Sequence, residues 1–203
     1  MNNRNLLNAW LLACSAAMLS ACATTGQGPE LSQAIVSPYR DAIELSGRLY
    51  VNYEKGGQPD TLTGAFTWSQ SAAAVDLALL SPVGQTVAKI RVTPESATLT
   101  QAGRAPRVAG DIDSLSAQTL GWSLPVSGLR DWLQGYATGA GGTRFAASPA
   151  NNTVTTPDGW RLTFVSWHNE AAAHPAPKRI DAQRDATASA GALALRIVVD
   201  PQS

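Results

Sequence analysis

Residues that could crosslink the chain or bind a metal are scarce. The 203 residues include two cysteines and two histidines. Cys14 lies in an apolar leader, so Cys22 is the only cysteine expected in the mature chain, which excludes a disulfide framework. His168 and His174 share no zinc-like spacing with acidic residues. We expect them to be solvated loop histidines, and we expect no metal and no cofactor.

An excess of one charge and the motifs of common enzymes are also missing. Lys plus Arg and Asp plus Glu number 15 each, with no basic run, so nucleic acid is not an expected partner. The sequence holds no Gly-X-Ser-X-Gly, and residues 139–143 (GAGGT) lack the lysine of a phosphate loop. Asp111 and Asp113 are interpreted as helix caps and not as a catalytic pair. We therefore expect that the protein is not an enzyme.

The first 22 residues carry a strong targeting signal. One positive charge at Arg4 precedes an apolar stretch at residues 6–19 (LLNAWLLACSAAML), which has signal-peptide length and is too short to span a bilayer. Leu19-Ser20-Ala21-Cys22 follows and resembles the bacterial lipobox, in which small residues let a peptidase cut before a thiol that receives diacylglycerol. We expect N-acyl and S-diacylglycerol groups on Cys22. The alternative is an ordinary secretory signal with a chance cysteine.

The predicted domain organisation follows from this leader. Residues 1–21 form a signal peptide that is removed, and removing 21 residues from 203 leaves 182, enough for one domain with a real core. Residues 22–43 are predicted to hold the lipidated N-terminus, a polar linker and a short helix over residues 37–43. Residues 44–203 form the folded domain. No later apolar run is long enough to cross a membrane.

Alternating apolar and polar residues predict an antiparallel sheet in two runs of strands. The first run comprises residues 45–53, 62–68, 75–79, 86–92 and 97–100. The second run comprises residues 144–147, 152–155, 160–167, 178–184 and 193–199. In the strand at 160–167, we expect Trp160, Leu162 and Phe164 on one side. Val165 and Trp167 are expected on the other side.

Two helices are predicted between the two runs. Asp113 is expected to cap a helix that ends at Gly121, and Ser127 a helix that ends at Gly135. A sheet this long should curl, and one face needs a cover. The helices are the only candidates for that cover, so the fold class is mainly β with α.

Several segments between residues 45 and 200 match one family when they are taken in order. They are Gly47-Arg48-Leu49, residues 64–68 (GAFTW), residues 79–85 (LLSPVGQ), residues 120–126 (LGWSLPV), Gly128-Leu129, Trp132-Leu133, Gly135, Gly159-Trp160 and residues 195–200 (LRIVVD). With these segments, the chain resembles the LolB family of outer-membrane lipoprotein receptors.

The resemblance implies a fold and an activity. The fold is an incomplete, curved antiparallel half-barrel covered by helices, with an apolar cavity inside. The activity is to accept acylated lipoproteins from a soluble periplasmic carrier (LolA-like) and insert them into the inner leaflet of the outer membrane, as a monomer, without nucleotide or metal. Ala23 in place of Asp after the lipidated cysteine implies outer-membrane delivery and attachment on the periplasmic side.

The resemblance also implies a membrane-insertion loop at Pro82, Val83 and Gly84. The family has an exposed leucine where this chain has Val83. Valine is one methylene smaller, worth about 0.8 kcal/mol of apolar transfer. We expect the role to survive in weakened form or shared with neighbours. Pro201 follows Asp200 where the family often has a tryptophan, which affects the strand end.

Ten apolar residues are candidates to line the acyl cavity: Leu49, Phe66, Trp68, Leu79, Ile90, Trp122, Leu124, Leu129, Trp132 and Phe164. The alternative for each is that it fills a closed core. Two rival functions remain open. One is a lipoprotein that binds another lipid, such as a phospholipid or a lipid-linked sugar. The other is a hydrolase, against which the missing motifs argue.

Overall fold

The computed structural model describes residues 31–201 except Gly56, Gly121 and residues 188–190. These residues belong to one compact unit, Leu31–Ser203. The predicted signal peptide, Cys22 and Ala23 lie outside the described residues. Within the described part, no helix is long and apolar enough to cross a membrane.

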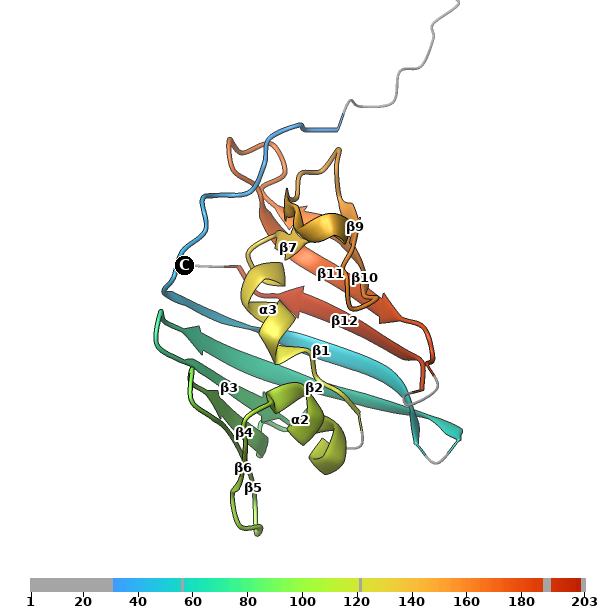
Figure 1. Ribbon diagram of the computed structural model, residues 1–203. Helices are drawn as coiled ribbons and strands as arrows, with labels where there is room; N and C mark the ends of the chain where they lie inside the picture. Colours follow the sequence, from blue (N-terminus) through green and yellow to red (C-terminus); the bar gives the residue numbers. More distant parts are fainter. Residues whose placement is uncertain (1–30, 56, 121, 188–190, 202–203) are drawn as a thin grey trace, which may run out of the picture. The chain divides into compact units, whose positions relative to one another are not determined.

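A ten-stranded antiparallel sheet forms most of the unit, as predicted (Figure 1). Its order is β6-β5-β4-β3-β2-β1-β12-β11-β10-β9. The strands are β1 (Ile43–Lys55), β2 (Gln58–Gln70), β3 (Val75–Leu80), β4 (Thr86–Val92), β5 (Ala97–Gln101), β6 (Arg107–Ala109), β9 (Thr153–Thr155), β10 (Arg161–His168), β11 (Ala176–Arg184) and β12 (Leu193–Val199). The first and last strands pair in the middle, and β6 and β9 are the two edges, so the curved sheet stays open.

Close approach of neighbouring strands explains one glycine of the family motifs. Gly47 on β1 pairs with Phe66 on β2 and with Val199 on β12. A Cβ atom at Gly47 would overlap the carbonyl oxygen of Val198 and meet the Phe66 ring. Any side chain here would therefore force β12 or the Phe66 ring away from β1.

The side assignment predicted for β10 is wrong at one residue. Trp160, Leu162 and Phe164 are buried and Val165 is exposed, as expected, but Trp167 is buried as well. The register against β11 shifts on both sides of Ser166, which marks a β-bulge. An extra residue in a strand reverses the alternation beyond it, so Trp167 returns to the inner face.

The two predicted helices are present as α2 (Ile112–Leu120) and α3 (Val126–Trp132), on the same side of the sheet in Figure 1. Of the predicted caps, Asp111 is confirmed, because its side chain accepts the Asp113 N–H (3.0 Å) at the start of α2. Asp113 and Ser127 are wrong as caps, because they lie inside α2 and α3. Gly135 follows α3 with φ +83°, the left-handed conformation that ends a helix.

Three short elements escaped prediction. They are strand β6, strand β7 (Tyr136–Thr138), which pairs with β8 (Arg144–Ala146), and the 3-10 turn η1 (Ala140–Gly142). The predicted helix over residues 37–43 is wrong. Residues 31–42 have no helix, and β1 already begins at Ile43. This segment makes tertiary contacts instead of helical ones.

Candidate apolar interior and surface loop

All ten candidate lining residues are buried. Six of them surround one interior space: Leu49, Phe66, Trp68, Leu79, Leu124 and Leu129. Three residues that we did not select complete the lining: Leu77, Leu133 and Ile197. Each continues a pattern already visible in the sequence. Leu77 is two residues before Leu79, and Ile197 lies between Leu195 and Val199 in an alternating strand. Leu133 lies one helical turn after Leu129. The lining is apolar throughout and comes from β1, β2, β3, β12, α3 and the residues flanking α3.

The interior is almost filled. The remaining space is about 20 Å³, which is room for about one water molecule. The other four candidates, Ile90, Trp122, Trp132 and Phe164, are buried but do not border this space.

Aromatic packing accounts for the position of two of these four residues. The Trp132 ring meets the Trp160 ring edge-on, with 5.6 Å between centroids. The Phe164 ring stacks on Trp167 at 6.1 Å. Trp132 also packs against Gly128, where a Cβ atom would overlap its ring. The Gly128-to-Trp132 spacing of the family motif thus serves helix packing.

A cluster of hydrogen bonds joins α2, the connector and α3. The Asp113 carboxylate accepts the Val126 N–H (3.1 Å) and the Ser127 hydroxyl (2.8 Å). The buried Ser116 hydroxyl donates to the Asp113 carbonyl (2.8 Å) and accepts the Leu124 N–H (2.9 Å). Burial raises the pKa of Asp113 above 3.8, although the hydrogen bond from Ser127 opposes the shift. The two helices and their connector are therefore bonded into one piece.

The contact between this piece and the sheet is mainly apolar. Leu124 and Leu129 face Leu49, Phe66 and Trp68 across the interior space. One firm polar link is the Arg130 guanidinium, which donates to the Ser71 carbonyl at 3.0 Å. We call this contact between the helical piece and the sheet the apolar seam.

The predicted insertion loop joins β3 to β4 as a tight turn. The Gly84 N–H donates to the Ser81 carbonyl (2.8 Å), and the Ser81 N–H donates to the Gln85 carbonyl (2.8 Å). Pro82 occupies the second turn position, and Gly84 has φ +81°. Val83 is 80% exposed. A tight turn thus presents an apolar side chain to solvent.

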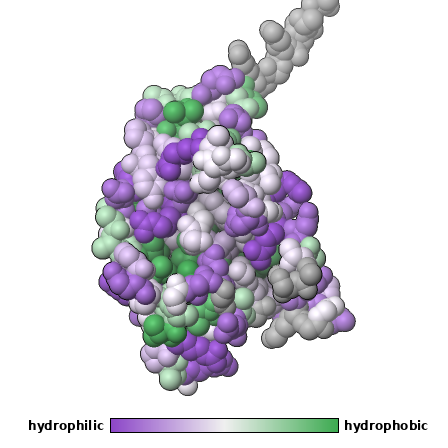
Figure 2. All heavy atoms as spheres, in the orientation of Figure 1, coloured by the Kyte–Doolittle hydropathy of each residue, from purple (hydrophilic) through white to green (hydrophobic). Residues whose placement is uncertain are grey.

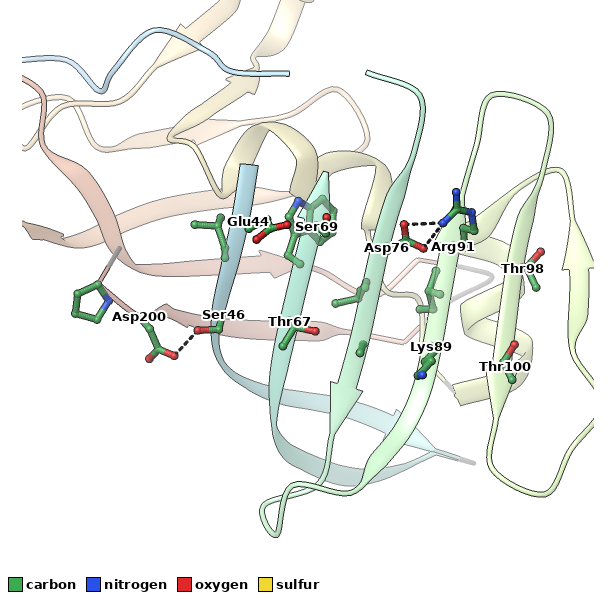
Figure 3. A pocket seen from close by; sticks show the side chains of 16 residues that line it. Glu44, Ser46, Thr67, Ser69, Asp76, Lys89, Arg91, Thr98, Thr100 and Asp200 are labelled. Carbon is green, nitrogen blue, oxygen red and sulfur yellow. Dashed lines mark hydrogen bonds and ion pairs between the residues drawn. The ribbon is translucent and has the colours of Figure 1, made fainter. Parts of the chain in front are cut away.

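A larger hollow of about 1030 Å³ lies on the other face of strands β1 to β5 (Figure 3). Its polar side chains alternate along the strands with the buried ones, so they point away from the apolar interior, and the buried residues Leu45, Trp68, Leu77 and Ile90 also border it. Thr67, Ser69 and Lys89 line it, and Arg91 forms an ion pair with Asp76 (2.8 Å). Hydroxyl and charged groups make its lining more polar than that of the apolar interior.

The histidines have structural contacts. His168 Nε2 lies 2.9 Å from the Val199 carbonyl oxygen at the end of β10, so the expectation of a solvated loop position is wrong for this residue. The ring of His174 lies in a loop, and its Nδ1 is 3.2 Å from the Ile35 carbonyl oxygen. Among the described residues, no group of three or more His, Cys, Asp or Glu is placed to hold a metal.

An open, curved antiparallel sheet with an apolar interior, behind a leader that ends in a lipobox, defines a small β-sheet lipoprotein. A family model described as outer membrane lipoprotein LolB matches residues 41–201. The chain belongs to the LolB family. Its members are outer-membrane, lipid-anchored lipoproteins that act as receptors in lipoprotein localisation.

Curated relatives match over nearly the whole chain. The outer-membrane lipoprotein LolB of Cupriavidus taiwanensis is 35% identical, covering 92% of each chain. The one of Cupriavidus metallidurans is 36% identical, covering 96% of this chain and 91% of the relative. A solved LolA superfamily protein of Nitrosomonas europaea aligns with a TM-score of 0.48 at 10% identity, over 82% of this chain and 87% of that one. That likeness is too distant to bear on fold or function.

Proposed function

We propose that this protein accepts acylated lipoproteins from a soluble LolA-like carrier and inserts them into the inner leaflet of the outer membrane. Cys22 carries the acyl anchor. Helices α2 and α3 cover the concave face of the sheet, and the cargo's acyl chain enters beneath them. The observation that supports this proposal is the interior lining, in which nine apolar side chains from the sheet and from the helical piece converge.

Acceptance of a chain requires the helical piece to move. The interior holds about 20 Å³ of free space, and an acyl chain needs far more than the roughly 30 Å³ of one water molecule. The hydrogen bonds lie within the helical piece, while its contact with the sheet is the apolar seam. Separation along the seam therefore breaks few polar contacts, and the incoming chain replaces the apolar ones. Each buried methylene contributes about 0.8 kcal/mol.

The transfer needs no catalysis. A chain that passes directly from one apolar interior to another is never exposed to water, and the transfer makes and breaks no covalent bond. Because the lining side chains are apolar apart from the Trp68 indole N–H, which donates to Gln70 (3.2 Å), the interior itself does not select one acylated molecule over another. A phospholipid or a lipid-linked sugar is therefore the rival ligand, and mass spectrometry of lipids that co-purify with the domain separates the two.

The acceptance step is tested with the Cys22→Ala domain mixed with a carrier loaded with an acylated lipoprotein. The domain should take the lipoprotein and hold it through gel filtration. Leu129→Gln, which places an amide in the apolar seam, should abolish acceptance. Val165→Gln makes the same kind of change at a 40% exposed position and should not. A correctly folded Cys22→Ala domain that takes no cargo overturns the proposal.

The insertion step is tested at the tip of the β3–β4 turn. Val83→Glu should leave acceptance intact and block delivery to liposomes, because a carboxylate at an 80% exposed tip resists entry into lipid. Val108→Glu, at a 66% exposed position on edge strand β6, is the matched control and should deliver normally. Equal loss of both steps in Val83→Glu would remove the loop from the mechanism.

A further inference from the structure

The chain ahead of β1 is bound to the folded unit in an extended conformation. The Ser32 carbonyl accepts the Ala150 N–H (3.1 Å), and the Val36 N–H donates to the Ala147 carbonyl (3.1 Å). Residues 31–42 nevertheless belong to no helix or strand. Figure 1 shows this blue segment crossing the unit toward the start of β1. We call residues 31–42 the docked segment.

Side chains from the region after α3 hold the docked segment. The Gln134 amide accepts the Arg40 N–H (2.9 Å) and donates to the Arg40 carbonyl (3.0 Å). The Tyr136 hydroxyl donates to the Ser37 carbonyl (2.8 Å). Val36 is buried against Gly135, where a Cβ atom would overlap its side chain. The Gln134 amide thus bonds both the N–H and the carbonyl of Arg40, as a neighbouring strand would in a β-sheet.

Aromatic residues add a second clamp. The rings of Tyr39 and Tyr136 meet edge-on at 5.9 Å. The Arg144 guanidinium lies over both rings, 5.0 Å and 4.6 Å from their centroids. The Gln70 amide donates to the Tyr39 hydroxyl (2.9 Å). The docked segment is thus held by contacts from β2, from the end of α3, and from β7 and β8. Its composition alone would assign it to a linker.

The first part of the docked segment turns apolar side chains outward. Leu31 is 54% exposed and Ile35 is 52% exposed. The Ile35 carbonyl oxygen lies 3.2 Å from His174 Nδ1, so the backbone at this point contacts the body of the unit. In Figure 2, apolar side chains reach the surface at this end, where the segment begins.

Docking shortens the tether between the anchor and the body. Cys22 and Leu31 are nine residues apart, whereas Cys22 and Ile43 are 21 apart. At about 3.5 Å per residue, these chains span at most about 32 Å and about 74 Å. Effective concentration falls with about the −3/2 power of tether length. Release of the segment would therefore lower the concentration of the body at the bilayer about 3.5-fold.

We infer that the docked segment sets which end of the protein meets the bilayer, with Leu31 and Ile35 contacting lipid. The occupant of this apolar surface is the membrane that holds the Cys22 acyl chains, because nine residues keep Leu31 within about 32 Å of it. The inference rests on the proposed acylation of Cys22. It does not depend on cargo transfer.

The test uses the mature acylated protein in vesicles of phosphatidylethanolamine and phosphatidylglycerol that contain headgroup spin-labelled lipid. Because lipid consumes the Cys22 thiol, one added cysteine can be labelled with a fluorophore. Ala150→Cys reports from beside Ser32, and Ala102→Cys from the β5–β6 turn at the other end of the unit (Figure 1). Quenching should be at least threefold stronger at position 150 than at position 102.

Variants separate docking from general stability. Val36→Asp and the milder Gln134→Ala should each bring the ratio of quenching at the two positions close to one. Val165→Asp adds the same charge away from the segment and should leave the ratio unchanged. Leu31→Ser with Ile35→Ser should weaken quenching at position 150 while thermal unfolding stays unchanged. Gln134→Ala keeps the test decisive if Val36→Asp does not fold.

Three results would overturn the inference. They are equal quenching at the two positions in the parent protein, an unchanged ratio after Gln134→Ala, and an N-terminal peptide mass without acyl groups. No carrier or cargo is present, so a protein that fails to accept lipoproteins can still show the orientation. Conversely, loss of orientation leaves acceptance by the Cys22→Ala domain unaffected.

Discussion

Leu124 offers a direct measure of how tightly the helical piece packs on the sheet. It is fully buried in the connector between α2 and α3, and it lines the residual interior space. Leu124→Ala removes three carbons, and comparable core truncations cost about 2.7–5 kcal/mol. The hydrogen bond from the Leu124 N–H to Ser116 (2.9 Å) limits collapse of the backbone into the gap. We expect a loss of about 3 kcal/mol in the free energy of unfolding.

Urea unfolding followed by tryptophan fluorescence measures this loss. All five tryptophans of the described residues are buried, so their emission should shift to the red on unfolding. With a denaturant slope of about 2 kcal/mol per molar, the midpoint should fall by about 1.5 M. Val165→Ala, at a 40% exposed position, should change stability by less than about 0.5 kcal/mol. A Leu124→Ala loss below about 1 kcal/mol, or one equal to the control, would refute the packed seam.

Three further predictions concern charge and backbone. Burial raises the pKa of Asp113 above 3.8 in the folded protein, so the stability that this group contributes is present below pH 3.8 and is lost as pH rises through the raised value. The side chain of Asp113→Asn can still accept the Val126 N–H and donate to Ser127. At pH 7 this variant should therefore unfold at a urea concentration no lower than that of the parent, and its stability should vary less between pH 3.5 and 7. A large loss of stability at pH 7 would contradict this. For Asp181, burial raises the pKa, but hydrogen bonds and charge from Arg179 and Arg196 prevail and lower it. The stability that this group contributes is therefore present above pH 3.8 and is lost as pH falls through the lowered value. Asp181→Asn should cost up to about 1 kcal/mol of stability at pH 7 and less in acid, and an equal cost at both pH values would exclude the ion pairs as its cause. Gly135→Ala should lower the thermal midpoint, with a cost of about 1 kcal/mol or more, because the residue has φ +83° and abuts Val36; an unchanged midpoint would show that the docked segment tolerates displacement.

The strands were predictable because burial on one face imposes a period of two. Residues 86–92 were predicted as a strand, and β4 has the same bounds. The fifth strand differs from prediction by one residue at its end, and α3 begins and ends two residues earlier than a cap at Ser127 and a stop at Gly135 predict. These elements carry several apolar residues at the correct spacing, so the hydrophobic pattern is redundant and a single exception does not obscure it.

Features set by tertiary contact were not predictable. Strand β6 (RVA) is three residues long, and its identity comes from pairing with β5 and not from its own pattern. The bulge in β10 changes the side of Trp167, although the local sequence alternates normally. The docked segment was predicted as linker and helix because its partners, Gln134 and Tyr136, are about a hundred residues away in the sequence.

In the candidate site, too, the residues set by local alternation were predictable and those set by tertiary contact were not. The buried faces of β1, β2 and β3 were evident from alternation, so Leu49, Phe66 and Leu79 were placed on the correct face. Which apolar residues border the interior space depends on how α3 lies across the sheet. No one-dimensional pattern separates Leu129, which borders that space, from Trp132, which packs against Trp160.

A filled interior suits a protein that must release what it accepts. An acyl chain of sixteen methylenes gains about 13 kcal/mol on leaving water. In the proposed function, its entry into the interior must also separate the apolar seam, which costs free energy. Entry into the bilayer has no such cost. A free-energy difference of about 3 kcal/mol favours the bilayer over the interior by about a hundredfold. Transfer would then run toward the bilayer without hydrolysis of a nucleotide. Leu124→Ala, which weakens the seam, should therefore bind an acyl chain more tightly and deliver it to liposomes more slowly than the parent. Tighter binding with unchanged delivery would show that the seam does not drive release.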